Sequence, residues 1–132
     1  MFDWRRPHNL GVTNGRLAPC RRTPNCVCSQ ADPSDAEHYI AALKGTMEAV
    51  RKAVQSLPRA TIVSEQQNYL YAQFRSKLLG FVDDVEFFYD GSAIQVRSAS
   101  RLGRRDFGVN RNRVERLRAL LSRPATSSTQ RP

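Results

Sequence analysis

The stretch FVDDVEFFYDGSAIQVRSASR, residues 81–101, decides the fold because it has the pattern of a β-hairpin. Its centre, Asp90-Gly91, is a dipeptide that favours a two-residue type I′ turn, since both central residues of that turn need a positive φ. The resulting register sets apolar side chains opposite apolar ones, and a slip of one residue would invert every face. The predicted pairs are Tyr89 with Ser92, Phe87 with Ile94, Val85 with Val96, and Asp84 with Arg97.

Two more strands are expected before this hairpin. Residues 59–64 form a short β-branched run, and a polar turn comes after it. Residues 69–76 alternate, so that Leu70, Ala72 and Phe74 share one face. These segments predict an antiparallel sheet of about four strands.

Two helices are expected to pack on that sheet. Gly45-Thr46 interrupts the helical period that starts at residue 34, so we favour a shorter helix over about 47–57, capped by Thr46. Asn110 is expected to cap a second helix that ends near Leu121 and buries a stripe of apolar residues. An antiparallel sheet with helices on it defines the α+β class.

The chain length of 132 residues suits one domain of ordinary size. Residues 1–33 are rich in Pro, Gly, Asn and Arg, and are expected to form an irregular arm that wraps the domain. Residues 34–122 would form the α+β domain, and residues 123–132 a disordered tail.

The positive charge is concentrated near the C-terminus. Residues 97–132 carry ten arginines and two acidic residues, a net +8, whereas residues 1–96 carry eleven basic and ten acidic residues, a net +1. No apolar run is long enough for a transmembrane segment, and the first residues lack the apolar part of a signal peptide. We therefore expect a cytoplasmic protein, exported only if the start site is misplaced.

Three cysteines, Cys20, Cys26 and Cys28, have the spacing C-x5-C-x-C. This spacing matches neither a zinc ribbon nor a C-x-x-C redox motif. Plain thiols in a packed loop, a Cys20–Cys26 disulfide and a metal site with His8 or His38 are all compatible with it. A reducing cytoplasm argues against the disulfide, and we expect no metal and no cofactor.

Several motifs occur together and in order along the chain. They are N-L-G-V from Asn9, P-N-C-V-x-S-Q from Pro24, F-R-S from Phe74, F-V-D-D-V-E-F from Phe81, R-S-A-S-R from Arg97 and F-G-V-N-R-x-R-V-E from Phe107. Over residues 7–121 the chain thereby resembles the bacterial and plastid family called domain of unknown function 1499. The resemblance implies a fold and candidate positions, but no reaction, because no activity is established for that family.

The chain departs from the usual pattern of that family in three places. Cys28 stands where the family usually has Ser, and Arg21 where Pro commonly comes after the first cysteine. Arg104 and Arg105 occupy positions that are usually less basic. The C-terminal charge is therefore partly peculiar to this chain, which weakens nucleic-acid binding as a family function.

The strand pattern predicts a polar sheet face that could bind a ligand. Asp84, Glu86, Arg97 and Arg101 project to one face, and Arg75 lies on the neighbouring strand. Small hydroxyls accompany them, and the arm would cover the site. The full set of candidate ligand-binding residues is Arg75, Ser76, Asp84, Glu86, Arg97, Ser98, Ser100, Arg101, His8, Asn25 and Ser29.

These residues are compatible with a lattice of cross-strand ion pairs and also with a binding module. We adopt the binding module because small hydroxyl groups crowd beside the arginines. Arg97 and Arg101 would anchor the negative group of an anionic or zwitterionic small molecule or of a protein partner's segment. Asp84 and Glu86 would orient those arginines or bind a cationic end.

Two other functions compete with this one. Weak, non-specific binding of nucleic acid or of an anionic surface could use the arginine-rich residues 101–123. A hydrolase-like enzyme could use Asp83, Asp84 and Glu86, but the nucleophile elbow, the phosphate loop and the H-E-x-x-H motif are all absent from the sequence. We therefore lean away from an enzyme.

Overall fold

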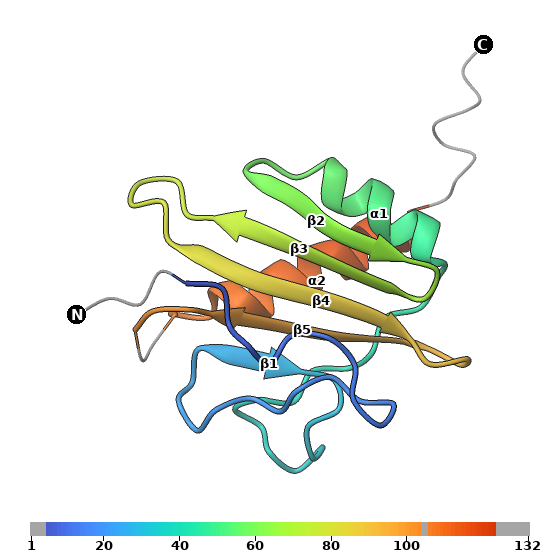
Figure 1. Cartoon of the computed structure of the whole chain (residues 1–132), viewed down its shortest axis with the longest axis horizontal. Helices are drawn as coiled ribbons and strands as arrows, with labels where there is room; N and C mark the ends of the chain where they lie inside the picture. The colour runs from blue at the N-terminus through green and yellow to red at the C-terminus, as the bar shows by residue number, and fades with distance from the viewer. Residues whose placement is uncertain (1–4, 104–105, 124–132) are drawn as a thin grey trace.

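The computed structural model describes residues 5–103 and 106–123, and over these residues it shows a five-stranded antiparallel sheet with two helices on one face (Figure 1). The strand order is β1-β5-β4-β3-β2. The elements are β1 (Cys26–Cys28), α1 (Met47–Gln55), β2 (Ala60–Gln66), β3 (Tyr69–Arg75), β4 (Val82–Tyr89), β5 (Ile94–Ser100) and α2 (Val109–Leu121).

The predicted α+β class is confirmed. The sheet gains a fifth strand because Cys26–Cys28, within the segment expected to be irregular, pairs with β5. Residues 104–105 and the part of the expected tail from residue 124 onward lie outside the described residues.

The hairpin forms, but its predicted register is wrong by two residues. Tyr89 pairs with Ile94, and Arg97 pairs with Glu86 rather than with Asp84. The loop has four residues because the Asp90 carboxylate accepts the backbone N–H groups of Ser92 and Ala93, both at 2.9 Å. These hydrogen bonds, above all the one from the Ala93 N–H, lower the pKa of Asp90 to about 2. A shift of two residues preserves the faces, so the prediction of which side chains share a face still holds.

The core lies between the helices and one face of the sheet. Leu70, Ala72 and Phe74 of β3 face this core, as the sequence predicts. The Thr46 hydroxyl caps α1 by accepting the N–H of Ala49 at 3.0 Å, which confirms the shorter helix. The chain before α1 runs close to the sheet, and Leu43 bridges to Ile94. Neither helix within the described residues is both long enough and apolar enough to cross a bilayer.

Asn110 is not the helix cap that the sequence predicts. Gly108 holds the N-cap position of α2 with a φ of +79°, and the Asp106 carboxylate accepts the N–H groups of Gly108 and Asn110 instead. Asn110 is the second residue of α2, and it is fully buried. Its amide donates to the Asn25 carbonyl at 3.1 Å, and its carbonyl accepts from the Ser98 hydroxyl at 2.6 Å. Asn110 thus ties α2 to the strands β1 and β5.

Three of the arginines of α2 are occupied within the protein. Arg111 and Arg118 donate to backbone carbonyls of residues 36–42. Arg113 donates to Asp83 at 2.8 Å and lies over the ring of Phe74. These guanidinium groups fix α2 to its surroundings, so less of the helix charge faces outward than the sequence pattern indicates.

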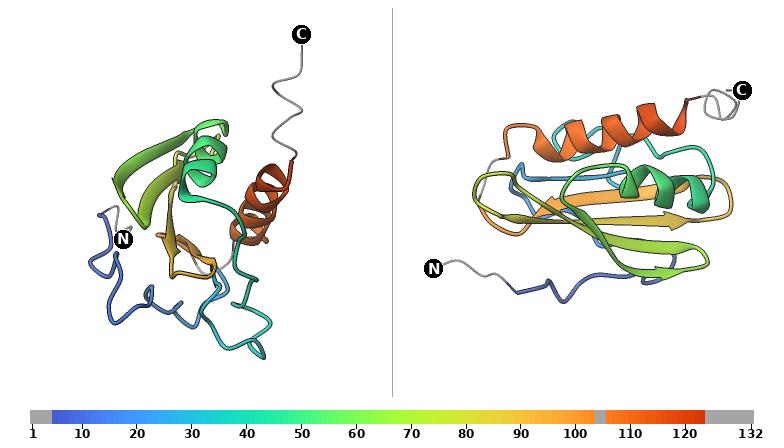
Figure 2. Two further views of the ribbon diagram at one scale, coloured as in Figure 1. Left: turned by 90° about the vertical axis from the view of Figure 1, so that its right-hand side faces the viewer. Right: turned by 90° about the horizontal axis from the view of Figure 1, so that it is seen from above.

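The arm crosses the face of the sheet opposite to the helices, as the view from above in Figure 2 shows. Near Gly11 it is anchored to β4, because the Gly11 N–H donates to the Glu86 carboxylate at 2.6 Å. The sheet is therefore covered on both faces, by helices on one and by the arm on the other.

The substitution Asn110→Asp should destabilise the fold. It replaces a buried amide donor with a carboxylate beside Asp106, and we expect a loss of about 2–4 kcal/mol in the free energy of unfolding. The matched control is Asn112→Asp, at an exposed position of the same helix, which should change that free energy by less than about 0.5 kcal/mol. Urea denaturation followed by circular dichroism measures both, and equal effects would contradict the structural role of Asn110.

Candidate functional site

The face of the sheet under the arm carries a buried ion pair. Asp84 of β4 is 2% exposed, and Arg101 binds it with both arms of its guanidinium, Nε to Oδ2 at 2.8 Å and Nη2 to Oδ1 at 2.9 Å. The Tyr71 hydroxyl also donates to Asp84. These hydrogen bonds to Asp84 raise the pKa of the Arg101 guanidinium. The bidentate geometry fixes Arg101 at the end of β5.

A second pair, Glu86 and Arg97, lies beside the first and is less completely bonded. Glu86 is fully buried and accepts hydrogen bonds from the Gly11 N–H and from the Tyr69 hydroxyl. Arg97 Nη1 lies 3.9 Å from Glu86 Oε1, and Nη2 donates to the Pro19 carbonyl. Glu86 Oε1 and Arg97 Nε have no hydrogen-bond partner among the described residues.

Burial controls the proton affinity of this second pair. It raises the pKa of Glu86, although the hydrogen bonds from Tyr69 and Gly11 and the charge of Arg97 act in the opposite direction. Burial and the neighbouring Glu86 carboxyl also raise the pKa of the Tyr69 hydroxyl. Tyr69 therefore acts as a hydrogen-bond donor at neutral pH.

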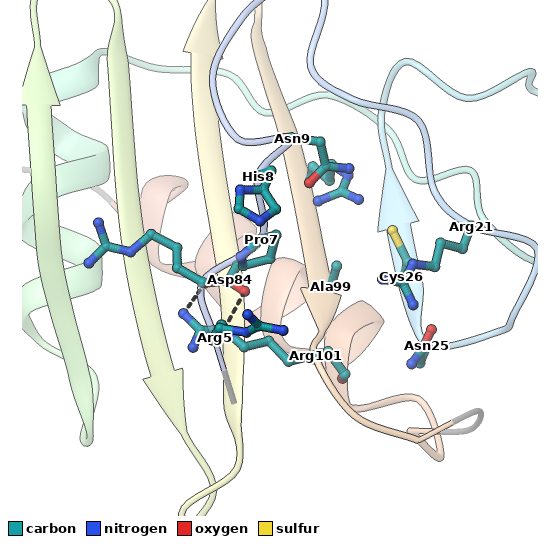
Figure 3. Close-up of a pocket in the computed structure, with 13 residues that line it drawn as sticks. Arg5, Pro7, His8, Asn9, Arg21, Asn25, Cys26, Asp84, Ala99 and Arg101 are labelled. Atoms are coloured by element: carbon teal, nitrogen blue, oxygen red, sulfur yellow. Dashed lines mark hydrogen bonds and ion pairs between the residues drawn. The ribbon is translucent and has the colours of Figure 1, made fainter. Parts of the chain in front are cut away.

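A pocket of about 380 Å³ opens between these strands, the arm and the loop before β1 (Figure 3). Asp84 and Arg101 lie on one side of it, and Arg21 and Asn25 on the other. The lining residues are Arg5, Arg6, Pro7, His8, Asn9, Arg21, Asn25, Cys26, Asp84, Arg97, Ala99, Ser100 and Arg101.

The charge of this pocket is strongly positive. Its lining includes five arginines, Arg5, Arg6, Arg21, Arg97 and Arg101, but Asp84 is the one carboxylate among the described residues that line it. Asp84 is already engaged by Arg101 and Tyr71. Arg97 is paired with Glu86 behind the pocket wall, whereas Arg6 and Arg21 form no ion pair among the described residues.

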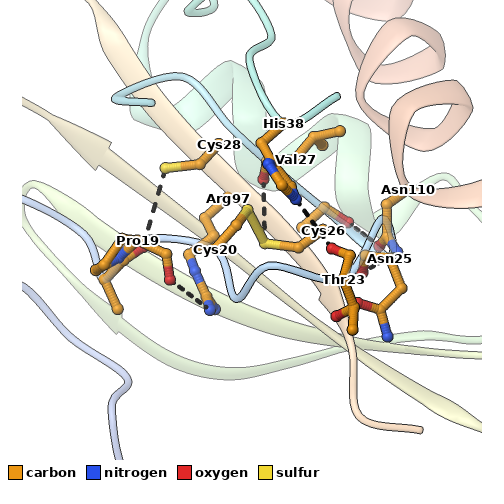
Figure 4. The surroundings of a disulfide bond; sticks show 12 residues. Pro19, Cys20, Thr23, Asn25, Cys26, Val27, Cys28, His38, Arg97 and Asn110 are labelled. Atoms are coloured by element: carbon orange, nitrogen blue, oxygen red, sulfur yellow. Dashed lines mark hydrogen bonds between the residues drawn. A yellow bond between two sulfur atoms is a disulfide. The ribbon is translucent and has the colours of Figure 1, made fainter. Parts of the chain in front are cut away.

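A disulfide shapes one wall of the pocket (Figure 4). It joins Cys20 to Cys26 and closes the short loop that carries Arg21 and Asn25. Asn25 is buried, and its amide donates to the Gly103 carbonyl at 2.8 Å. The disulfide thus closes this loop onto β1, and the Asn25 side chain fixes it to the chain after β5.

His38 supports the same loop from behind. Its Nε2 lies 2.9 Å from the Thr23 carbonyl, and its Nδ1 lies 2.8 Å from the Asp35 carboxylate. Burial alone would lower the pKa of His38, but these two hydrogen bonds raise it above its usual value. Because both partners are acceptors, the doubly protonated imidazolium satisfies them.

The pocket contains six of the eleven predicted site residues. They are His8, Asn25, Asp84, Arg97, Ser100 and Arg101. A seventh, Glu86, is buried next to Arg97 but does not line the pocket.

The structure places the other four elsewhere. Ser98 faces the helices, where its hydroxyl donates to Asn110, because its parity on β5 is opposite to that of Arg97. Ser29 donates to Gln95 and holds the backbone of β5. Ser76 closes the β3–β4 loop, and Arg75 lies at the exposed end of β3 near α2. The expected crowding of Ser76 and Ser98 around the arginines does not occur.

Sequence reasoning missed Arg5, Arg6, Asn9 and Arg21. These residues lie in irregular segments, where no hydrophobic period assigns a side chain to a face. The signal that was available is local: Arg5-Arg6 precedes His8, and Arg21 comes directly after a cysteine that could form a disulfide across the neighbouring turn.

The third cysteine and the acidic groups offer no metal site among the described residues. No cluster of three or more His, Cys, Asp or Glu side chains is placed there to hold a metal ion. Cys28 is a free, buried thiol whose pKa is raised by burial, so it is a poor nucleophile.

The fold and the site define a small α+β domain with a basic pocket beneath an N-terminal arm. The chain belongs to the family described as "Protein of unknown function (DUF1499)", which matches residues 16–121. No curated protein matches the chain.

The disulfide is expected to contribute to stability. Its cysteines are six positions apart, and closing a loop of that length stabilises the folded state by about 2 kcal/mol. Dithiothreitol should therefore lower the unfolding free energy of the wild type and of Cys28→Ser by this amount. The double variant Cys20→Ser/Cys26→Ser should not respond to dithiothreitol, and a response equal to that of the wild type would contradict the assignment.

Glu86→Gln should change how stability depends on pH. The pKa of Glu86 is raised above its usual 4.5, so the folded state binds this proton more tightly than the unfolded state. The wild type must therefore lose stability, relative to Glu86→Gln, as the pH rises above 4.5. The expected difference is about 1.4 kcal/mol for each unit by which the pKa is raised.

Urea denaturation of both proteins between pH 4 and pH 8 measures this difference. Glu48→Gln, at an exposed position on α1, controls for the loss of one charge. If the stability of Glu86→Gln relative to the wild type fell with rising pH, burial would not dominate the Glu86 site.

Proposed function

We propose that this protein is a binding module whose pocket holds a small anionic molecule. The observation that carries the proposal is the excess of guanidinium groups over carboxylates in the pocket lining, five against one. Arginine presents a planar fork of donors that matches phosphate and carboxylate groups. A concave wall with charges of one sign also concentrates the field and attracts a ligand of opposite charge.

The bonding within the site supports a purely anionic ligand over a zwitterion. Asp84 is engaged by Arg101 and Tyr71, and Glu86 by Gly11 and Tyr69. Glu86 Oε1 has no hydrogen-bond partner among the described residues, but Glu86 is buried beside Arg97 and does not line the pocket. The role of the two carboxylates in this proposal is therefore to hold Arg101 and Arg97 in place. Arg97 is 95% buried and its Nε lacks a partner among the described residues, which makes it the strongest candidate anchor.

The size of the pocket favours a small molecule over a polymer. A cavity of about 380 Å³ lies at the lower end of the range for small-molecule sites. A compound with two or three phosphate or carboxylate groups could contact several arginines at once. The arm carries Arg6 and His8, and it would cover the bound ligand on the side away from the sheet.

The competing functions gain no comparable support. Arg111, Arg113 and Arg118 of α2 are bonded within the protein, which removes most of the predicted nucleic-acid surface on that helix. The hydrolase alternative needs its carboxylates in one cleft. Asp83 lies on the helix side and is paired with Arg113, whereas Asp84 faces the arm.

The disulfide bears on the expected cytoplasmic location. Reducing thiols in a cytoplasm open exposed disulfides, whereas an oxidising compartment preserves them. Cys26 is 3% exposed, whereas Cys20 is only half-buried, so the Cys20 sulfur is the more open to attack by an external thiolate. An oxidising compartment would therefore keep the loop of Arg21 closed more securely than a reducing one.

Arg21→Glu tests the proposal. Arg21 is exposed and lines the pocket, so reversing its charge should weaken binding without unfolding the protein. With pyrophosphate and citrate as probes, we expect the dissociation constant to rise at least about tenfold, the effect of about 1.4 kcal/mol of lost attraction. Isothermal titration calorimetry at constant ionic strength measures it.

The neighbouring Arg22→Glu is the matched control. Arg22 is also exposed but does not line this pocket, so its variant should bind within about twofold of the wild type. Equal weakening by the two variants would show a general surface charge effect, and an absence of binding to either probe would likewise contradict the pocket.

A further inference from the structure

Two loops at one end of the sheet expose large apolar side chains. The β3–β4 loop presents Leu78, 89% exposed, and Leu79, 68% exposed. The loop between β5 and α2 presents Phe107, 88% exposed, and Val109 at the start of the helix is half-exposed. A single exposed apolar side chain is normal on a protein surface, but several that gather at one place and are rimmed by polar residues mark an interaction site.

The local structure holds these side chains outward. The β3–β4 loop is closed at its base, because the Ser76 N–H donates to the Phe81 carbonyl and the Phe81 N–H donates to the Ser76 hydroxyl. Leu78 and Leu79 therefore lie beyond the last bonded pair of the hairpin. Phe107 has a φ of +52°, a left-handed conformation that costs free energy for a bulky residue. Such strain is typical of functional positions.

The two loops project from the same end of the molecule, as the perpendicular views in Figures 1 and 2 show. Arg75 at the end of β3 and Val109 at the start of α2 also line one shared hollow. We call the exposed apolar residues Leu78, Leu79, Phe107 and Val109 the apolar tip.

Positive charge surrounds the apolar tip. Lys77 adjoins the leucines, and Arg59, Arg75 and Arg116 are exposed nearby, at the first residue before β2, the end of β3 and the second turn of α2. None of these four forms an ion pair within the described residues. Of the acidic residues described at this end, Asp106 is bonded to the N-terminus of α2, and the buried Asp83 is paired with Arg113.

We propose that the apolar tip docks on the surface of an anionic lipid bilayer. A bilayer interface accepts apolar side chains from two separate loops without needing a complementary groove, and anionic headgroups attract the surrounding Lys and Arg side chains. Leu78, Leu79 and Phe107 enter the boundary between headgroups and acyl chains. Lys77, Arg75 and Arg116 remain among the headgroups.

Vesicle flotation tests this proposal. The wild type should bind vesicles of equal parts phosphatidylcholine and phosphatidylglycerol, and bind much less to phosphatidylcholine alone. The variant Leu78→Ser/Leu79→Ser should lose at least about tenfold in apparent partitioning, because it removes most of the apolar area of one loop. High salt should weaken wild-type binding, since the headgroup attraction is screened.

The matched control is Val12→Ser. Val12 is another exposed apolar residue, but it lies by the β2–β3 turn at the opposite end of the sheet. This variant should bind vesicles within about twofold of the wild type, as expected for a surface change away from the docking site.

Three outcomes would overturn the proposal. They are no preference for anionic vesicles, equal binding by Leu78→Ser/Leu79→Ser and the wild type, and concentration-dependent self-association that the double variant abolishes. The last outcome would assign the apolar tip to a second copy of the chain. The double variant should bind pyrophosphate as the wild type does, so the pocket and the apolar tip can fail separately.

Discussion

The need to neutralise three buried carboxylates on β4 constrains the rest of the structure. Strand alternation sends Asp83 toward the helices and Asp84 and Glu86 toward the arm, so each face must supply a cation or donors. On the helix side Arg113 pairs with Asp83, and on the arm side Arg101 pairs with Asp84. An unpaired buried charge would cost several kcal/mol, so α2, the end of β5 and the arm are all held to this one strand.

That constraint also separates structural arginines from those that the fold does not need. Arg101 and Arg113 form ion pairs with buried carboxylates, and Arg118 donates hydrogen bonds to backbone carbonyls. Arg21 forms no ion pair with the buried carboxylates Asp83, Asp84 and Glu86, yet it lines the same pocket as Arg101. A fold-based account therefore explains why the pocket contains some positive charge but not why it contains this much, and the excess favours a ligand.

The sequence predicted the features that depend on periodicity and missed those that depend on single side chains. The faces of β3, β4 and β5 were predictable because apolar residues alternate along them. The hairpin register was not, because the Asp90 carboxylate bonds two backbone N–H groups and lengthens the loop. Asn110 is a residue type that often caps helices. Here the Asp106 carboxylate accepts the N–H groups at the start of α2, and the Asn110 side chain bonds within the core instead. The pocket lies partly on irregular segments, whose side chains have no predictable direction.

The net charge of the chain is +9, and several of its acidic groups are buried or already hydrogen-bonded within the fold. Asp83, Asp84 and Glu86 are buried, and Asp90 and Asp106 are bonded to backbone N–H groups of their own loops. Carboxylates that are buried or bonded to nearby backbone groups are poorly placed to neutralise arginines elsewhere on the surface. Positive charge therefore collects at two separate places, the pocket beneath the arm and the end of the sheet around Leu78. The first place is concave and suits a small anion, whereas the second is apolar at its centre and suits an extended anionic surface.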